Sequence, residues 1–434
     1  MAQLQELQEP SAAGESAHGG RFVQSADRTR KCNAHRACMA LAVCLLPVLS
    51  LGCDRLLTTR PAPGTRFDQP IDGLGNGELG QFQRGQIQFR RGFTIDEGLG
   101  PIFNNRACVA CHSADGRGGL ANILVRFSRG SDLAIAEGGP QIQDRAIPGA
   151  VPEQLPSGVD VSRRLPPPVF GMGLIEAIPE STILAFADPS DGDGDGISGR
   201  PNWVTPAPYV PAGEPGGGPG PRLGRFSRKA QVPALLQQAV EAYHQDMGIT
   251  SSSRPVDNVN PLAPGTLGRD QGEDPEVRDG EVQSVVDYIR MLAPPAPGEW
   301  TERRRRGEAL FTAARCASCH VPSMRTGAHE IAAVANRDAA LYSDLLLHDL
   351  GDGLADQRPD GSADGREWRT ALLWGLRLAA EFMGGHMFLL HDGRARSVEE
   401  AIRLHGGEAT ASRNQFVAMP AADREALLDF VESR

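Results

Sequence analysis

The sequence predicts a mainly α-helical protein with long loops and two domains of the same kind. The first observation is a repeated C-x-x-C-H pattern, at Cys108, Cys111 and His112 and again at Cys316, Cys319 and His320. The second is composition: 51 glycines and 33 prolines in 434 residues favour loops. The third is a helical spacing of apolar residues ahead of the second copy, at Val282, Val285, Val286, Ile289 and Leu292.

The repeated pattern is typical of a covalently attached c-type haem. Two thiols spaced by two residues can each add to a haem vinyl group, and the histidine that follows is placed to bind the iron. A zinc site or a redox dithiol is the alternative, but neither requires a histidine directly after the second cysteine in both copies. Phe103 and Phe311 each precede their motif by five residues. We therefore expect two covalently bound haem c groups in two cytochrome c-like domains.

The predicted domain organisation follows from the position of the two motifs. Pro294 and Pro295 end the helix ahead of the second motif and mark the boundary. Residues 120–160 have the pattern of strands and loops, so the first domain contains a loop- and strand-rich insertion. The expected segments are a leader at 1–52, a tether at 53–66, an N-terminal cytochrome c-like haem domain at 67–295 and a C-terminal one at 296–434.

The N-terminal segment resembles an export signal. Basic residues precede an apolar run from Met39 to Leu51, and Cys53 follows Gly52. This layout predicts a signal peptide, with Cys53 as a candidate lipoprotein cysteine; a plain signal is the alternative. The run is too short for a membrane-spanning helix. Because haem c is normally attached outside the cytoplasm, we expect a periplasmic protein, with a candidate lipid anchor at Cys53.

Net charge limits the classes of binding partner, and the positions of the cysteines limit the disulfides that could form. A formal net charge of −10 argues against nucleic acid as a partner and is compatible with a basic electron-transfer protein. Four of the eight cysteines belong to the two motifs, and the other four lie in the first 53 residues. No cysteine therefore remains in the body of the chain for a disulfide.

Glu176 is the acid in an otherwise apolar stretch from Leu165 to Pro179, ahead of a helix expected to start near Pro179. In a structural role this carboxylate would cap a helix or pair with an arginine. In a catalytic role, apolar surroundings would raise its pKa and let it transfer protons near pH 7. The composition of the segment favours the structural role.

An acidic loop follows, in which Asp191, Asp193 and Asp195 alternate with glycine. Such spacing brings several oxygens around one centre, as in the first half of an EF-hand, and makes these residues candidate Ca²⁺ ligands. The twelfth position is Asn202 rather than glutamate, so a complete EF-hand is not expected. A solvated acidic turn is the alternative.

His405 lies on the apolar face of a helix that begins at the capping box of Ser397 and Glu400. A histidine in such a place is usually a core residue with satisfied hydrogen bonds, but a distal iron ligand is the alternative because a haem has to be covered here. Outside the leader and the motifs the histidines are unevenly distributed, since none lies between His112 and His244 and five follow the second motif.

At this point the chain resembles the bacterial di-haem peroxidase superfamily, and more closely the di-haem oxidoreductase family often labelled "thiol oxidoreductase". The resemblance covers roughly residues 65–434. It rests on residues 100–112, Gly-Leu-Ile-Glu-Ala-Ile-Pro at 173–179, the acidic loop at 193–202, Tyr-Ser-Asp-Leu-Leu-Leu-His-Asp at 342–349, and Leu-His-Asp-Gly-Arg-Ala at 390–395.

The resemblance implies roles for particular residues. In di-haem peroxidases the segment matching His391 lies 14 residues before the distal ligand of the C-terminal haem, which corresponds to His405. The resemblance makes both His391 and His405 candidate cofactor-binding residues. Peroxidases typically have methionine there, and histidine would lower the haem potential. Glu176 falls near the distal glutamate of the peroxidases. Their distal histidine on the N-terminal haem has no counterpart, which implies an open or differently ligated iron at His112.

The expected function is therefore a peroxidase-like di-haem oxidoreductase. The C-terminal haem would receive electrons from a small-protein or quinol-linked donor, and the N-terminal haem would meet a small oxidant such as peroxide beside Glu176. The alternative is a di-haem electron-transfer cytochrome without its own catalysis. Thiol oxidation has no support, because no free cysteine pair remains once both haems are attached.

Overall fold

The computed structural model describes residues 62, 64–266 and 270–434. The residues from Pro61 to Arg434 form one compact unit. The predicted leader and Cys53 lie outside the described residues. Among the described helices, none combines the length and apolar character that a bilayer crossing demands.

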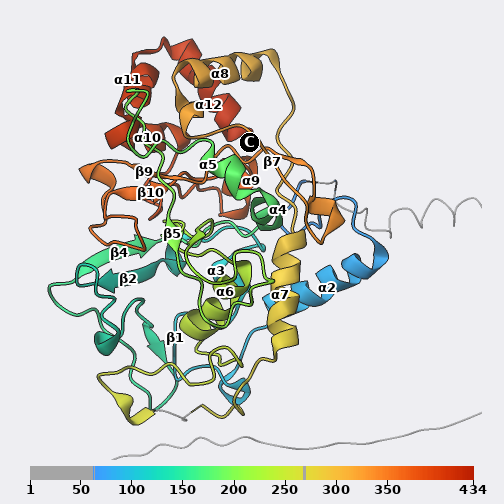
Figure 1. Cartoon of the computed structure of the whole chain (residues 1–434), viewed down its shortest axis with the longest axis vertical. Coiled ribbons are helices and arrows are strands. Elements are labelled where there is room, and N and C mark those ends of the chain that lie inside the picture. Colours follow the sequence, from blue (N-terminus) through green and yellow to red (C-terminus); the bar gives the residue numbers. More distant parts are fainter. Residues whose placement is uncertain (1–61, 63, 267–269) are drawn as a thin grey trace, which may run out of the picture. The chain divides into compact units, whose positions relative to one another are not determined.

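Two pairs of helices organise the fold. Helix α2 (Asn76–Arg90) packs against α7 (Asp279–Met291), and α8 (Glu302–Ala313) packs against α12 (Ala421–Glu432) (Figure 1). The valines of α7 that the sequence placed on one face are buried, which confirms that face. In the second pair, arginines of α8 form ion pairs with acids of α12: Arg303 with Glu425, Arg304 with Asp429 and Arg306 with Asp423.

Shorter helices complete the helical part. They are α3 (Cys108–Cys111), α4 (Met172–Ala177), α5 (Glu180–Leu184), α6 (Leu235–Glu241), α9 (Leu376–Phe382), α10 (Val398–Leu404) and α11 (Thr410–Ala418). Helix α6 begins at Leu235, after Pro233, and continues as a π-helical turn over Ala242–Asp246. Ser397 caps α10 as predicted, since its side chain accepts a hydrogen bond from the Glu400 amide.

The described strands form five two-stranded antiparallel ribbons. They pair β1 (Ile102–Phe103) with β3 (Arg145–Ala146), β2 (Leu124–Ser128) with β4 (Asp160–Arg164), β5 (Trp203–Val204) with β6 (Arg222–Leu223), β7 (Met324–Arg325) with β8 (Asp338–Ala339), and β9 (Leu347–Asp349) with β10 (Glu367–Arg369). Because β7 to β10 follow the second motif, strands are not confined to the predicted insertion. The fold is therefore a mixture of helices and strands rather than the mainly α-helical fold that the sequence predicts.

The largest hydrophobic core joins segments from before and after residue 295. Phe67 stacks on Phe170 with 4.9 Å between ring centroids, and both belong to the same cluster as Leu341 and Trp374. A smaller cluster contains Phe311, Tyr342, Phe416 and Phe430. The shared core fixes the regions around both motifs against one another. The domain boundary at 295/296 stays a prediction.

Candidate functional site

The first C-x-x-C-H motif is fixed by the residues just ahead of it. Cys108 and Cys111 lie on α3, and the side-chain amide of Asn105 lies 3.4 Å from the Cys111 sulfur. The backbone amides of Asn104 and Asn105 donate to the carbonyl of Asp246, at 2.8 and 2.9 Å. The motif is thereby attached to the π-helical turn at the end of α6.

The His112 imidazole is enclosed and suited to bind a metal. Burial lowers its pKa to about 4, so the ring is neutral near pH 7. The Phe89 ring, from α2, lies against it with centroids 6.1 Å apart. Its Nδ1 atom is buried and makes no hydrogen bond of regular geometry with the described residues. Phe103 precedes its motif by the same five residues as Phe311, but it lies on β1 and pairs with Arg145 in the β1–β3 ribbon.

A cavity of about 590 Å³ lies near this motif, although Cys108, Cys111 and His112 are not among its lining residues. Its wall includes Pro167 and Arg228, which both influence the pKa of His112, and Asp246, which influences both motif thiols. Within the described part of the chain, the lining residues include neither histidine nor methionine. The cavity therefore offers space for a haem beside His112 but no second imidazole or thioether for its iron.

Buried guanidinium groups near the cavity lack sufficient counter-charge. Burial lowers the pKa of Arg117 to about 10, and one of its terminal nitrogens has no hydrogen-bond partner among the described residues. Burial also lowers the pKa of Arg126 to about 10 and that of Arg228 to about 9. Buried cations normally require paired anions. The two carboxylates of a haem would supply them, so this region fits the group.

The second motif presents a similar histidine. Cys316 begins a short 3₁₀ turn, and burial lowers the pKa of His320 to about 4. Its Nδ1–H donates to the Tyr342 carbonyl at 2.9 Å, which leaves Nε2 free to bind a metal. The Phe311 ring, from α8, lies 6.3 Å from the imidazole.

His405 lies close to His320, because a charge on His405 would lower the pKa of His320. It follows the last residue of α10, and its Nδ1–H donates to the Ala401 carbonyl at 2.6 Å. Burial lowers its pKa, so this ring too is neutral and has a free Nε2. Both histidines could therefore serve as ligands of one haem iron.

The sequence reasoning missed a role for His348 beside the second motif. His348 lies 3.6 Å from the Cys319 sulfur and contacts Asp344 and Glu408, each at 2.7 Å. Burial opposes its charge, but the two carboxylates raise its pKa well above the usual value. Glu408 also accepts hydrogen bonds from the amide and hydroxyl of Ser198. The segment 342–349, on which the family resemblance partly rests, contains His348 and Asp344. The other contacts of His348, Cys319 and Glu408, lie outside that segment.

These contacts weigh against a zinc site. Cys319, Asp344 and His348 could converge on a metal, but a histidine held between two carboxylates is protonated and is a poor ligand. Among residues 62, 64–266 and 270–434, no cluster of three such donors includes Cys108 or Cys111. Burial raises the pKa of the Cys108 thiol to about 12 and that of Cys111 to about 11, which disfavours thiolates. Uncharged thioethers suit both positions better.

Glu176 occupies a different place from the one expected for a catalytic acid. It pairs with the buried Arg290, with contacts of 2.6 and 3.1 Å, and His329 lies 3.2 Å away. Burial alone would raise its pKa, but His329 and Arg290 lower it overall. The contact agrees with the structural role that the sequence favours, whereas the lowered pKa differs from the rise expected in the catalytic alternative. Glu176 lines a separate cavity of about 360 Å³ and does not line the one beside His112.

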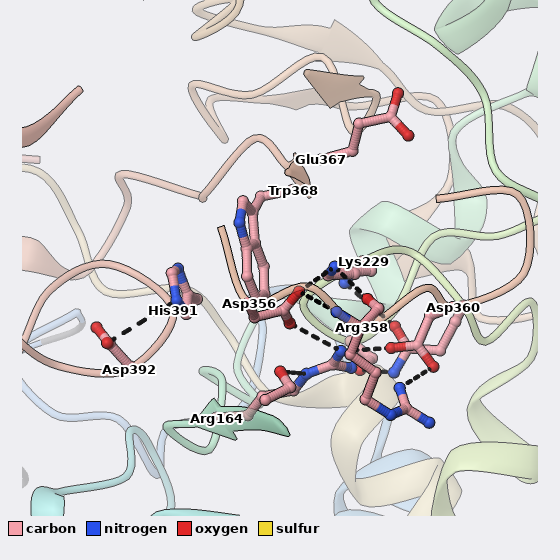
Figure 2. A network of polar contacts seen from close by, with 12 residues as sticks. Arg164, Lys229, Asp356, Arg358, Asp360, Glu367, Trp368, His391 and Asp392 are labelled. Atoms are coloured by element: carbon pink, nitrogen blue, oxygen red, sulfur yellow. Dashed lines mark hydrogen bonds and ion pairs between the residues drawn. The ribbon is translucent and has the colours of Figure 1, made fainter. Parts of the chain in front are cut away.

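His391 lies next to a buried polar network (Figure 2). Its ring stacks on Trp368 with 3.7 Å between centroids and 5° between planes. Burial, helped by Arg394 and other nearby cations, lowers its pKa to about 2. Its carbonyl accepts a hydrogen bond from the Leu165 amide. The predicted contact of His391 with a cofactor stays a prediction.

The network itself nearly balances its charges. Lys229 donates to Asp356 at 2.8 Å, and Arg164 and Arg358 both pair with Asp360 (Figure 2). All five side chains are buried. Three cations face two carboxylates and several carbonyls, and these contacts join the β4 region to the loop before β10. They support a structural role.

The acidic loop is arranged differently from the predicted Ca²⁺ site. Asp188, Asp191 and Asp193 bring ligand oxygens within 4.8 Å of one another. Asp195 forms an ion pair with Arg315, the residue directly before Cys316 of the second motif. The candidate ligand set thus gains Asp188 and loses Asp195.

The comparison with protein families agrees with a di-haem protein. A family described as "Di-haem oxidoreductase, putative peroxidase" matches residues 55–131 and 152–434. Hydrazine synthase from Kuenenia stuttgartiensis is similar at 13% identity and a TM-score of 0.37, covering 96% of this chain and 100% of that one. A MauG-like protein associated with microbial copper homeostasis is similar at 15% identity and a TM-score of 0.37, covering 87% and 93%. No curated protein matches.

Proposed function

Because this chain belongs to the di-haem oxidoreductase family, we propose that it reduces a small oxidant such as hydrogen peroxide at its first haem with electrons that enter at its second. One observation carries the proposal. A second imidazole, His405, lies near His320, whereas the described residues that line the cavity beside His112 include no histidine or methionine. An iron held at His112 can therefore accept an oxidant where one held at His320 cannot.

The residues of each site have separable tasks. Cys108 and Cys111 would attach the first haem, and Cys316 and Cys319 the second. The neutral imidazoles of His112 and His320 would bind the irons from one side. Bound haem supplies the one-electron steps and the position at which an oxidant reacts.

The second site is suited to electron entry without chemistry. His405 would complete the coordination of the iron and keep oxidants away from it. A ligand pair of two histidines gives a lower potential than histidine with methionine. Such a site would pass electrons readily to the first haem. The electron donor is proposed to be a small protein or a quinol-linked carrier.

Covalent haem attachment and the N-terminal signal pattern support a periplasmic location, with Cys53 as the proposed lipid anchor. The acidic loop around Asp188, Asp191 and Asp193 is a candidate for Ca²⁺. Neither proposal is needed for the chemistry at the first haem, so each can fail on its own.

Optical and EPR spectra of the purified holoprotein, recorded with and without peroxide and carbon monoxide, test the proposed function. We expect one high-spin haem that binds carbon monoxide and changes with peroxide, and one low-spin haem that does neither. Replacing Cys108 and Cys111 by serine should abolish the response, whereas replacing Cys316 and Cys319 should retain it. Two low-spin haems that ignore both reagents would leave an electron-transfer cytochrome as the better description.

A further inference from the structure

Asp246 is the last residue of the π-helical turn that follows α6, and it connects the first motif to the adjoining cavity. Its carbonyl holds the amides of Asn104 and Asn105, directly ahead of Cys108. Its side chain lines the cavity, where Gln141 donates to it at 2.7 Å. Turns of this kind occur often at functional sites, because the extra residue redirects a side chain.

The hydrogen bonds around Asp246 tolerate either protonation state. Both protons of the Gln141 amide are in use, one with Asp246 and the other with the Asn104 side-chain oxygen at 3.1 Å. Gln141 is therefore fixed as a donor and cannot turn its oxygen toward Asp246. A donor of this kind binds a carboxylate or the carbonyl oxygen of a carboxylic acid. Asp246 can thus gain or lose a proton without a change in its neighbours.

The charged groups that face Asp246 come from each element around it. Arg126, from β2, favours the ionised carboxylate, and Glu241, from α6, disfavours it. Cys108 and Cys111 face it from α3 and carry no charge as thioethers. Burial is the largest effect and raises the pKa of Asp246 to about 6. At neutral pH this carboxyl group is therefore close to the point at which a small change in nearby charge protonates it.

Other acids near the two cavities are less suited to gain and lose a proton. Glu241 lines the same cavity but accepts hydrogen bonds from Arg254 and from the Tyr209 hydroxyl, at 2.5 and 2.6 Å. Glu176 belongs to a different cavity and is paired with Arg290. Of the carboxylates compared, Asp246 is the one bound to a neutral amide rather than to a cation.

We propose that Asp246 takes up one proton when an electron enters the first haem site and releases it when the electron leaves. The electron comes from a one-electron donor, such as the second haem or an added mediator, and the proton comes from solvent. An O–H bond forms on the Asp246 carboxylate, no other bond changes, and the net charge of the cavity stays constant. The proposal rests on the attachment of a haem at Cys108 and Cys111, but not on the reaction with peroxide.

Spectroelectrochemical titration of the holoprotein at several pH values tests this proposal. We expect the midpoint potential of the first haem to fall as pH rises, with a slope that approaches about 59 mV per unit for one proton per electron. In Asp246→Asn the slope should be lost, because the amide cannot titrate. Glu241→Gln is the matched control in the same cavity: it should shift the potential and keep the slope. An unchanged slope in Asp246→Asn would overturn the proposal.

A measurement on the unaltered protein covers the case in which Asp246→Asn does not fold. The infrared difference spectrum between reduced and oxidised holoprotein should show a carboxylic acid carbonyl band that appears on reduction and moves in heavy water. The absence of such a band would contradict proton uptake by Asp246. Because neither experiment uses peroxide, failure of the proposed function would leave both results interpretable.

Discussion

The two motif regions are built alike on one side of the expected haem and differently on the other. Each has a helix pair, α2 with α7 or α8 with α12, and each pair places a phenylalanine ring 6.1 or 6.3 Å from the motif histidine. Burial lowers the pKa of both histidines to about 4. Beyond the histidine the likeness ends, since His405 approaches the second site and a polar cavity adjoins the first.

This contrast shows where the two sites have diverged. A helix pair and a buried imidazole serve to attach haem, and that requirement is common to both. What reaches the other face of the iron decides between electron transfer and reaction with a small molecule. The most informative experiments are therefore those that remove a shared part, exchange the differing part, or change only the surroundings of one site.

Removal of the motif cysteines, a feature that both sites share, should have the largest effect. Replacement of Cys108 and Cys111 by serine, or of Cys316 and Cys319 by serine, should each remove one covalent haem and leave the other. Mass spectrometry of the intact protein would count two haems in the unaltered chain and one in each variant. If either variant still carried two haems, the assignment of that motif would be wrong.

Replacement of His405, the residue that distinguishes the second site from the first, should have the next largest effect. His405→Ala should convert the whole low-spin signal of the second haem to high spin and let it bind carbon monoxide, because the free Nε2 near His320 is removed. His405→Met should keep the low-spin state and raise the potential. EPR and redox titration measure both outcomes. His386→Ala, at an exposed position, is the control, and a His405→Ala protein that stays low-spin would contradict the ligand assignment.

Glu176→Gln sharpens the contrast between the cavities. Arg290 is almost fully buried and would lose one of its two close carboxylate partners while it keeps Glu214, so we expect a loss of about 3 kcal/mol in the free energy of unfolding. The spectrum of the first haem should not change, because Glu176 lies in another cavity. Denaturant unfolding would measure the loss, and Glu137→Gln, which breaks an exposed pair with Arg129, should cost much less.

The pH dependence of stability gives a further check on Glu176. Because its pKa is lower in the folded protein than its ordinary value of 4.5, its pairing stabilises the fold above that value. This contribution should disappear as pH falls below about 4.5 and the carboxylate is protonated. Acid unfolding should therefore be steeper for the unaltered protein than for Glu176→Gln. Curves that stay parallel through this range would contradict the lowered pKa.

The smallest expected effect concerns Arg117. Its buried positive charge favours the reduced state of a nearby haem, so Arg117→Gln should lower the potential of the first haem by on the order of 60 mV, equivalent to a tenfold change in the equilibrium constant. The second haem should keep its potential. Arg129→Gln removes an exposed arginine of the same β2 region and serves as the control. Equal shifts in both variants would indicate a general charge effect.

Local patterns in the sequence predicted the motifs, the buried face of α7 and the cap of α10. Contacts between distant segments were not accessible to this reasoning. Phe103 matched Phe311 in spacing, yet Phe89, 19 residues before Cys108, occupies the equivalent position beside the histidine. The spacing of residues near a motif predicts only local geometry. Which aromatic ring contacts the motif histidine depends on how a more distant helix packs against it.

The same limit applies to the acids, whose partners could not be identified from the sequence. Glu176 was surrounded by apolar residues in the sequence, but its partner Arg290 comes from α7, more than a hundred residues later. Asp195 had the spacing of a Ca²⁺ ligand, but Arg315 pairs with it. Asp246 gave no sequence signal, because its environment is created by Gln141 and by the turn after α6. A carboxylate's role depends on partners that only the folded chain brings together.

Glu408 has a consequence for how the protein matures. It follows His405 by three residues and binds both His348 and Ser198. Under the proposed export from the N-terminus, both motifs would reach the attachment machinery before Glu408 emerges. The contacts of Glu408 with His348 and Ser198 would then form after both motifs have been exposed for haem delivery.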